Sequence, residues 1–387
     1  EQLKDKDVHI ANIEAELTLI KNSNSWRYLE FYRKIIYNKL PEKFPLLKNA
    51  ILTLKNEGIS SFYIKMIGFL NKNKNIASFG MIKNVYDHWL ERNSLSGKKA
   101  AEINKEIASF SYKPRISIIM PVYNVDETWL EKAIISVIDQ AYSNWELCIA
   151  DDASTRKHIR KLLNKYSAKD KRIKVKYLQK NMGISGASNE ALSIASGEYV
   201  GLLDNDDELT KDALYEYVKL LNQHQDAELI YSDEDKIDVN GKQMEPFFKP
   251  DYSPDLLLSM NYICHFSMFK RLLLNKIGGF RLGYEGSQDY DLILRYLEKT
   301  RPDRIFHIPK ILYHWRKIPG SAAAVVDAKN YAFISAKNAL SDYLERNKIE
   351  GEVTDGIFLG SYRVKRSIKS DSKISIIIPF RDKVTLL

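Results

Sequence analysis

The stretch "YVGLLDNDDEL", Tyr199–Leu209, joins an apolar run to a cluster of acidic residues. Its first five residues, 199–203, are typical of a buried β-strand. Three carboxylates follow within four positions, at Asp204, Asp206 and Asp207. Carboxylates this close together repel one another, and a cation bound among them would offset the repulsion. The stretch therefore predicts a buried strand that ends in a cation-binding turn.

Apolar strands and amphipathic helices alternate on both sides of this stretch. This alternation predicts an α/β domain with a mostly parallel sheet covered by helices on both faces. In such sheets ligands bind beyond the carboxyl ends of the strands. Three polar clusters follow strand ends and are expected to converge there: Pro121–Asn124, Asp151–Asp152 and Asp204–Asp207. The predicted strands are 116–121, 145–150, 173–178, 199–203 and 227–232, and the helices between them are 127–142, 156–170, 184–197 and 211–223.

The acidic turn has two interpretations. Asp204 and Asp206 alternate, so both carboxylates can face one hard cation, and Mg²⁺ or Mn²⁺ bridging to a diphosphate suits oxygen ligands. Alternatively, the turn caps the helix that begins near Lys211. A single Asp-x-Asp pattern is weak, but three polar clusters at strand ends favour the metal site.

Composition limits the class of protein. The chain has 387 residues, 44% of them hydrophobic, which predicts two or three domains of a globular protein. A net charge of +9 favours anionic partners such as nucleotide phosphates, lipid phosphate or a membrane surface. No compact basic cluster with interleaved aromatic residues points to nucleic acid. Cys148 and Cys264 both lie in apolar surroundings, which predicts buried thiols in a reducing compartment rather than a disulfide or a metal site.

Four segments are predicted along the chain. Residues 1–25 are the end of a coiled coil or an amphipathic helix, 26–110 form a helical region, and 111–350 form the α/β domain. The segment 351–387 is read as a linker and the start of a second copy, because "KISIIIPFRDKVTLL" (Lys373–Leu387) resembles "RISIIMPVYN" (Arg115–Asn124). The sequence is therefore expected to be a piece of a longer protein.

Several motifs together resemble the family 2 glycosyltransferases with the GT-A fold. They are "ISIIMPVYN", "ADDAS", "GASNEALSIASGEYVGLLDNDDEL" and "EGSQDYDLILR". "YSDEDKID", "FFKPDYSPDLLLSMNYICH" and "HIPKILYHWRKIPGSAA" resemble a subgroup, the modules of bacterial proteins that build O-antigen, rhamnan and related surface polysaccharides. These proteins often carry several modules on one chain, in agreement with the repeat at Lys373.

The resemblance implies roles for individual residues. Tyr123, beside Pro121, would stack on the nucleobase, and Asp152, with its neighbour Asp151, would bind the base. Asp206 would bind the metal, and Asp204 the metal or the ribose. Asp289 matches the general base that takes the proton of the acceptor hydroxyl. His314 would be a further metal ligand or a diphosphate contact, and an acceptor or diphosphate role is assigned to Glu285, Gln288, Trp315 and Arg316.

These residues also have structural interpretations. The Asp151–Asp152 pair would cap the following helix, Asp289 would complement the first turn of its own helix, and His314 would be a packed residue. The acidic motif "YSDEDKID" (Tyr231–Asp238) is expected to be a hairpin with solvated carboxylates rather than a second metal site.

The resemblance implies an inverting, metal-dependent transfer of a sugar, with rhamnose suggested by the subgroup. The donor would be a dTDP, UDP or GDP sugar, and the acceptor a lipid-linked glycan at the cytoplasmic face of the membrane. Ser188 and Gln288 depart from the Arg and Glu that many members carry. They are the main support for the alternative, a non-catalytic scaffold or glycan-binding module. A nucleotidyltransferase would need a glycine-rich basic loop after the first strand, and "PVYNVDETW" has neither glycine nor a basic residue.

Overall fold

A computed structural model describes residues 86–93, 97–318, 330–367 and 373–378. The segment predicted for residues 1–25, and most of the helical region predicted for 26–110, lie outside the described residues. The chain divides into two compact units, Glu1–Arg92 and Asn93–Leu387. Residues 86–92 of the first unit are helical. The candidate site lies entirely in the second unit.

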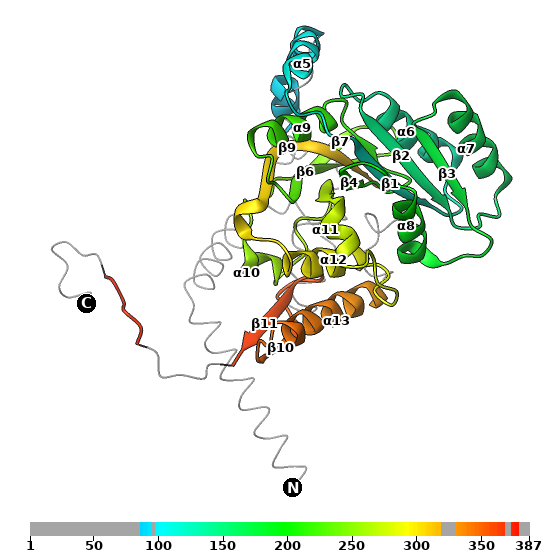
Figure 1. The fold of residues 1–387 in the computed structure, drawn as a ribbon. Coiled ribbons are helices and arrows are strands. Elements are labelled where there is room, and N and C mark those ends of the chain that lie inside the picture. The colour runs from blue at the N-terminus through cyan, green and yellow to red at the C-terminus, as the bar shows by residue number, and fades with distance from the viewer. Residues whose placement is uncertain (1–85, 94–96, 319–329, 368–372, 379–387) are drawn as a thin grey trace, which may run out of the picture. The chain divides into compact units, whose positions relative to one another are not determined.

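Within the described residues, a mixed sheet of nine strands forms the centre of the second unit (Figure 1). Its order is β3-β2-β1-β4-β8-β6-β9-β5, with β7 paired to β6. The first four strands in this order are parallel, as are β6 and β9. β8 runs antiparallel between β4 and β6, which the sequence did not predict. The strands are β1 Ile116–Val122, β2 Trp145–Asp151, β3 Ile173–Tyr177, β4 Tyr199–Leu202, β5 Glu208–Leu209, β6 Leu229–Ile237, β7 Gln243–Phe247, β8 Ser267–Lys270 and β9 Ile305–Arg316.

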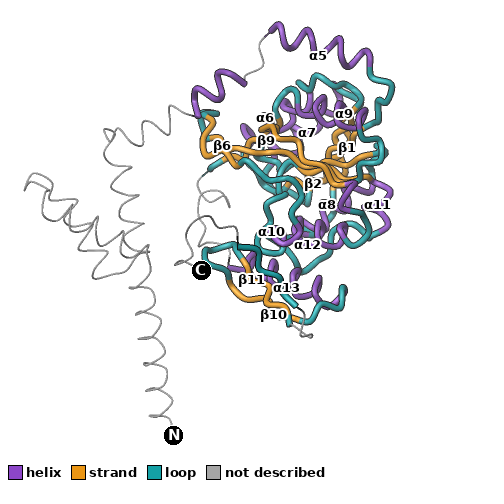
Figure 2. Tube along the Cα trace, turned by 90° about the vertical axis from the view of Figure 1, so that its left-hand side faces the viewer, coloured by secondary structure: helices purple, strands orange, loops and turns teal. Residues whose placement is uncertain are grey.

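Helices cover both faces of the sheet, which confirms the predicted α/β class (Figure 2). One core cluster joins the sheet to α6 and α9, and a second joins the other face to α8, α12 and α13. The side chains of β1 are apolar on both faces of the sheet because each face packs into one cluster. Ile118 and Met120 belong to the first cluster, and Ile119 belongs to the second. The helices are α5 Gly97–Ser109, α6 Glu127–Ile138, α7 Lys157–Lys169, α8 Gly183–Ser193, α9 Ala213–Gln223, α10 Pro254–Leu257, α11 Arg271–Lys276, α12 Gln288–Leu297, α13 Asn330–Arg346 and the 3₁₀ helix η1 Pro302–Arg304.

A polar cluster at the amino ends of the central strands ties β1 and β2 to the α8–β4 connection. Glu146 is 2% exposed and accepts hydrogen bonds from Ser117 Oγ at 2.6 Å and from the Ser196 amide at 2.5 Å. The amide of Gly197 donates to Ser117 Oγ at 2.8 Å. A Cβ at Gly197 would lie 2.6 Å from the same oxygen, so glycine permits this close approach.

Glu146 should make the stability of the fold dependent on acid. Burial alone would raise the pKa of Glu146, but hydrogen bonds from Lys174, Ser117 and Ser196 lower it from 4.5 to about 2. A lowered carboxylate pKa stabilises the folded state above the unfolded value of 4.5, and this stability is lost as pH falls towards 2. Glu146→Gln should remove up to about 3 kcal/mol of this dependence. Urea unfolding across this pH range measures it, with exposed Glu102→Gln as the control; an unchanged pH slope would contradict the assignment.

The acidic motif 231–238 is a hairpin strand, as predicted, but three of its four carboxylates are buried. It continues β6, which pairs antiparallel with β7. Asp233, Glu234 and Asp235 are 2%, 5% and 0% exposed. They are buried because basic partners reach them: His307 contacts Asp233, Lys249 contacts Glu234 and His314 contacts Asp235.

The carboxyl-terminal part contains a hairpin that the sequence did not predict. β10, Gly351–Asp355, pairs antiparallel with β11, Tyr362–Arg366, and Tyr362 packs into the second core cluster. Residues 373–378, where a strand was predicted, belong to no helix or strand. Ile374 and Ile377 are 86% and 89% exposed. A single strand without a partner leaves its backbone groups unpaired, so the predicted strand does not form here. The start of a second copy remains a prediction.

Among the helices of the described residues, none combines the length and the apolar character required to cross a membrane.

Candidate active site

The three polar clusters converge at the carboxyl ends of β1, β2 and β4. Asn205 Nδ2 donates to the carbonyl of Pro121 at 2.7 Å, which joins the acidic turn to β1. The amide of Asp152 donates to the carbonyl of Val122 at 2.8 Å, which joins β2 to β1. Parallel pairing brings the strand ends to one edge, so residues more than 80 positions apart meet there.

Residues at the end of β9 form hydrogen bonds with the acidic turn after β4. Asp207 is 0% exposed and accepts a hydrogen bond from Tyr313 Oη at 2.5 Å and from the Arg316 amide at 2.7 Å. The Arg316 side chain donates to the carbonyl of Asp206 at 2.8 Å and pairs with Glu208. Burial and the charges of Asp206 and Asp204 raise the pKa of Asp207 well above its usual value. Asp207 is therefore a structural anchor of the turn.

Asp204 and Asp206 are the other two carboxylates of the turn, and both are only partly buried. The side chain of Asp204 is 44% exposed, and its Oδ2 lies 3.8 Å from His265 Nε2. Burial, followed by the charge of Asp204, raises the pKa of Asp206 to about 6. Two crowded carboxylates, whose repulsion Arg316 and His265 offset only in part, are a donor set that fits Mg²⁺ or Mn²⁺. Asp204, Asp207 and His265 also have potential ligand atoms within 4.8 Å of one another.

The predicted nucleotide residues lie beside the turn. The ring of Tyr123 is 50% exposed directly after β1, where it is accessible for stacking. Asp152 is 2% exposed, and its Oδ1 accepts the Met182 amide at 2.6 Å, at the start of α8. Burial raises the pKa of Asp152. Asp151 accepts the Ser154 amide at 3.1 Å. The alternative that this pair caps the following helix is not observed, because α7 begins without a side-chain cap.

Asp289 lies at the start of α12 and is fixed by a neighbouring loop. Asn261 Nδ2 donates to Asp289 Oδ2 at 2.8 Å, and Cys264 Sγ lies 3.9 Å from the same oxygen. Burial raises the pKa of Asp289, with His265 and the backbone acting in the opposite direction. Only Oδ2 has these side-chain partners among the described residues, so Oδ1 can accept a proton from a bound molecule.

A small cavity of about 40 Å³ connects the acidic turn to Asp289. Its lining includes Pro121, Ser188, Asp204, Cys264, His265, Gln288 and Asp289. Tyr123 and Asp152 are not among its lining residues. Cys264, predicted to be a buried thiol in apolar surroundings, is instead only partly buried and lines this cavity near Asp289, whereas Cys148 is buried in the core.

The other residues predicted to contact the acceptor, the diphosphate or the metal make contacts within the protein. Gln288 lines the cavity and accepts the Gly286 amide at 2.8 Å, and Glu285 accepts the Gly283 amide at 3.0 Å. The Trp315 ring lies 5.5 Å from that of His265. His314 Nδ1 lies 2.5 Å from Asp235 and does not join the Asp204 cluster. Arg316 is 0% exposed under the turn, so its guanidinium is not placed to neutralise a diphosphate.

Four residues of the site were missed in the sequence. Asn261, Cys264 and His265 all lie in "NYICH", and Asp207 was included in the acidic cluster without a role of its own. Polar residues inside a largely apolar segment are the signal that could have identified them.

A protein-family model and several known proteins match the chain. The model described as glycosyl transferase family 2 matches residues 117–278. An uncharacterized protein of Sinorhizobium fredii is 42% identical over 298 residues, which cover 77% of this chain. The O-antigen biosynthesis protein RfbC of Myxococcus xanthus is 35% identical over 302 residues, 78% of this chain. The chain spans about a third of the first relative, at 32%, and 23% of the second.

Among solved structures, residues 1–349 of Staphylococcus aureus TarS in complex with UDP-GlcNAc match 59% of this chain. The match covers 66% of the TarS chain, with 21% identity and a TM-score of 0.48.

Proposed function

Because this chain belongs to the glycosyl transferase family 2 through residues 117–278, we propose that it is a metal-dependent, inverting glycosyltransferase. The donor is a nucleotide-diphosphate sugar, with dTDP-rhamnose as the first candidate and UDP or GDP hexoses as the others. The acceptor is a growing bacterial surface glycan on a lipid carrier. The relative named as an O-antigen biosynthesis protein supports this class of product.

One observation carries the proposal: a single cavity joins the exposed carboxylate of Asp204 to the partly buried carboxylate of Asp289. The two carboxylates have different environments, as two different roles require. Asp204 and its neighbour Asp206 are crowded, and Arg316 and His265 offset their repulsion only in part, which suits cation binding. Asp289 has a raised pKa and one oxygen that no side chain of the described residues contacts, which suits proton transfer.

The residues of this site act on opposite sides of the sugar. Tyr123 and Asp152 bind the nucleobase, and Asp204 and Asp206 hold the divalent ion. When bound, this ion would stabilise negative charge on the leaving diphosphate. Asp289 Oδ1 takes the proton of an acceptor hydroxyl, whose oxygen attacks the anomeric carbon. The bond from that carbon to the diphosphate breaks, and its electron pair leaves with the diphosphate. One displacement inverts the configuration, so no second carboxylate nucleophile is needed.

A donor screen tests this proposal directly. The chain is incubated with UDP-GlcNAc, UDP-glucose, dTDP-rhamnose and GDP-mannose, each with Mn²⁺ or with EDTA, and release of the nucleoside diphosphate is measured. We expect one donor to be hydrolysed slowly and only with Mn²⁺. Calorimetry with UDP, dTDP and GDP accompanies the screen. Absence of both hydrolysis and nucleotide binding would contradict the proposal and favour the scaffold or glycan-binding alternative.

A further inference from the structure

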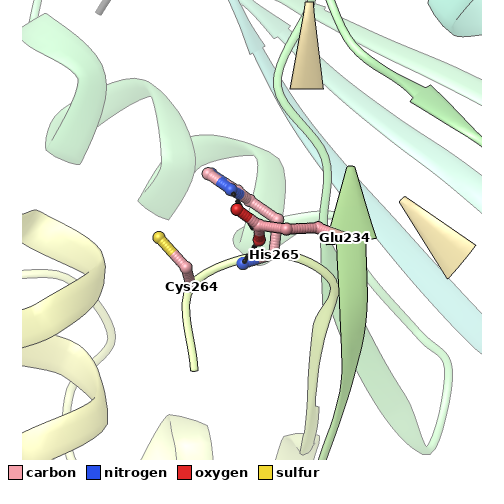
Figure 3. Close-up of side chains that lie close together, drawn as sticks. All are labelled: Glu234, Cys264 and His265. Carbon is pink, nitrogen blue, oxygen red and sulfur yellow. Dashed lines mark hydrogen bonds and ion pairs between the residues drawn. The ribbon is translucent and has the colours of Figure 1, made fainter. Parts of the chain in front are cut away.

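The loop that enters β8 presents two side chains to the site in an unusual backbone conformation. Cys264 and His265 lie on this loop, and Glu234 reaches them from β6 (Figure 3). Cys264 has φ +39°, in the left-handed region that residues with a Cβ rarely adopt. His265 lies 3.8 Å from Asp204, and Cys264 lies 3.9 Å from Asp289. The loop thus contacts both the proposed metal side and the proposed acceptor side.

Lys249 holds the two carbonyl groups on either side of Cys264. Its side chain is 0% exposed, and its ammonium donates to the Ile263 carbonyl at 2.9 Å and to the His265 carbonyl. The third contact is Glu234 Oε2, also at 2.9 Å. An ammonium has three donors, and these acceptors use all of them.

Glu234 holds the same loop through an amide. Its Oε2 accepts the His265 amide at 3.3 Å and lies 3.5 Å from His265 Nδ1. The side chain of Glu234 is 7% exposed. Burial alone would raise the pKa of Glu234, but Lys249 and His265 lower it to about 2, so the carboxylate is charged. Lys249 therefore binds two carbonyl groups of the loop, and Glu234 binds one of its amides.

A metal ion is the other candidate for this position. Glu234, Cys264 and His265 have potential ligand atoms within 4.8 Å of one another. However, the Lys249 ammonium already compensates the charge of Glu234 and would repel a second cation. The ammonium also links Glu234 to the carbonyl groups of Ile263 and His265. A metal bound to the three side chains would not contact these carbonyl groups. The contacts favour a positioning role.

We infer that Glu234 and Lys249 are positioning residues that fix the loop 261–265 between the two halves of the site. The inference rests on the proposed function and adds two residues to it. A buried ion pair adds little net stability compared with apolar residues of similar volume, because desolvation offsets the attraction. Its specific contribution here is geometric: it sets where His265 meets Asp204 and where Asn261 holds Asp289.

The test removes both charges together, because a single neutralising substitution would leave an unpaired buried charge and strongly destabilise the fold. The double variant Glu234→Gln with Lys249→Met keeps the side-chain volumes. The control is Glu146→Gln with Lys174→Met, which removes a pair with a buried glutamate at the opposite ends of the strands. Both variants are compared with the wild-type chain for urea unfolding, for Mn²⁺-dependent binding of UDP, dTDP and GDP, and for turnover of the donor that the wild type hydrolyses.

We expect the Glu234–Lys249 double variant to lose about 100-fold in kcat, because displacement of the loop by about 1 Å misaligns the reacting groups. The KM of the donor and the binding of its nucleotide should change less than about threefold, since Tyr123 and Asp152 are untouched. The control should keep its kcat. A purely structural role would lower stability without separating kcat from KM.

A second variant keeps the test decisive if the double variant does not fold. Glu234→Asp retains the charge but withdraws the carboxylate from the His265 amide, and should lower kcat about tenfold with little change in KM. A folded double variant, or Glu234→Asp, with kcat within about threefold of wild type would overturn the inference while leaving the glycosyltransferase proposal intact. An inactive wild-type chain would instead reject the proposed function itself.

Discussion

Replacing Asp289 with Asn is expected to lower the rate of sugar transfer by about 10² to 10⁴-fold, because the amide cannot take the acceptor proton. The asparagine side chain has nearly the same shape as that of aspartate, and its carbonyl oxygen can still accept the hydrogen bond from Asn261 Nδ2. The cavity and nucleotide binding should therefore be preserved. Steady-state kinetics with the donor identified in the screen, together with calorimetry for its nucleotide, measures the two effects separately.

The pH dependence provides a second readout of the same residue. Burial raises the pKa of Asp289 above 3.8, and the base acts in its deprotonated form. The value of kcat/KM in the wild type should therefore rise with pH through a pKa above the ordinary range of aspartate. The control is Asp303→Asn, an exposed carboxylate on η1. Full activity in Asp289→Asn, or equal losses in both variants, would remove Asp289 as the base.

Replacing Asp206 with Asn should raise the Mn²⁺ concentration needed for half-maximal nucleotide binding by at least about 100-fold. This residue has a pKa raised to about 6 by burial and by Asp204, so the site holds negative charge that a cation would relieve. Changes around metal ligands typically cost 10- to 100-fold in affinity, and loss of a direct ligand should cost at least as much. Calorimetry of nucleotide binding during a Mn²⁺ titration measures the effect.

The matched control for the metal prediction is Asp226→Asn, an exposed residue in the loop between α9 and β6. It should leave the Mn²⁺ dependence unchanged. Wild-type turnover should also stop in EDTA and return when Mn²⁺ is added in excess. Binding and turnover that do not depend on a divalent ion would contradict the role of Asp204 and Asp206 as metal ligands.

Local patterns were sufficient to predict the strands and helices around the site. The apolar runs at 116–121 and 199–203 became β1 and β4 because their residues are buried on both faces of the sheet. Predictions from short-range patterns were wrong where the outcome depended on a partner from a distant part of the chain. Residues 373–378 have the same apolar character as β1, but no strand in the described part of the chain pairs with them. The acidic segment of β6 is polar in sequence yet buried, because Lys249, His307 and His314 reach it from other strands and loops.

The sequence by itself determined the five strands and four helices between residues 116 and 232, and the polar residues that follow three of these strands, since both follow from side-chain periodicity along a few consecutive residues. Only the tertiary structure decided which acids of "DNDD" anchor the turn and which face the cavity. Asp207 is buried because Tyr313 and Arg316 reach it from more than 100 positions away. The Asp204 carboxylate has no such hydrogen bond within the described residues and lies 3.8 Å from His265. A carboxylate's role depends on burial and on its hydrogen-bond partners, and both are properties of contacts between distant segments.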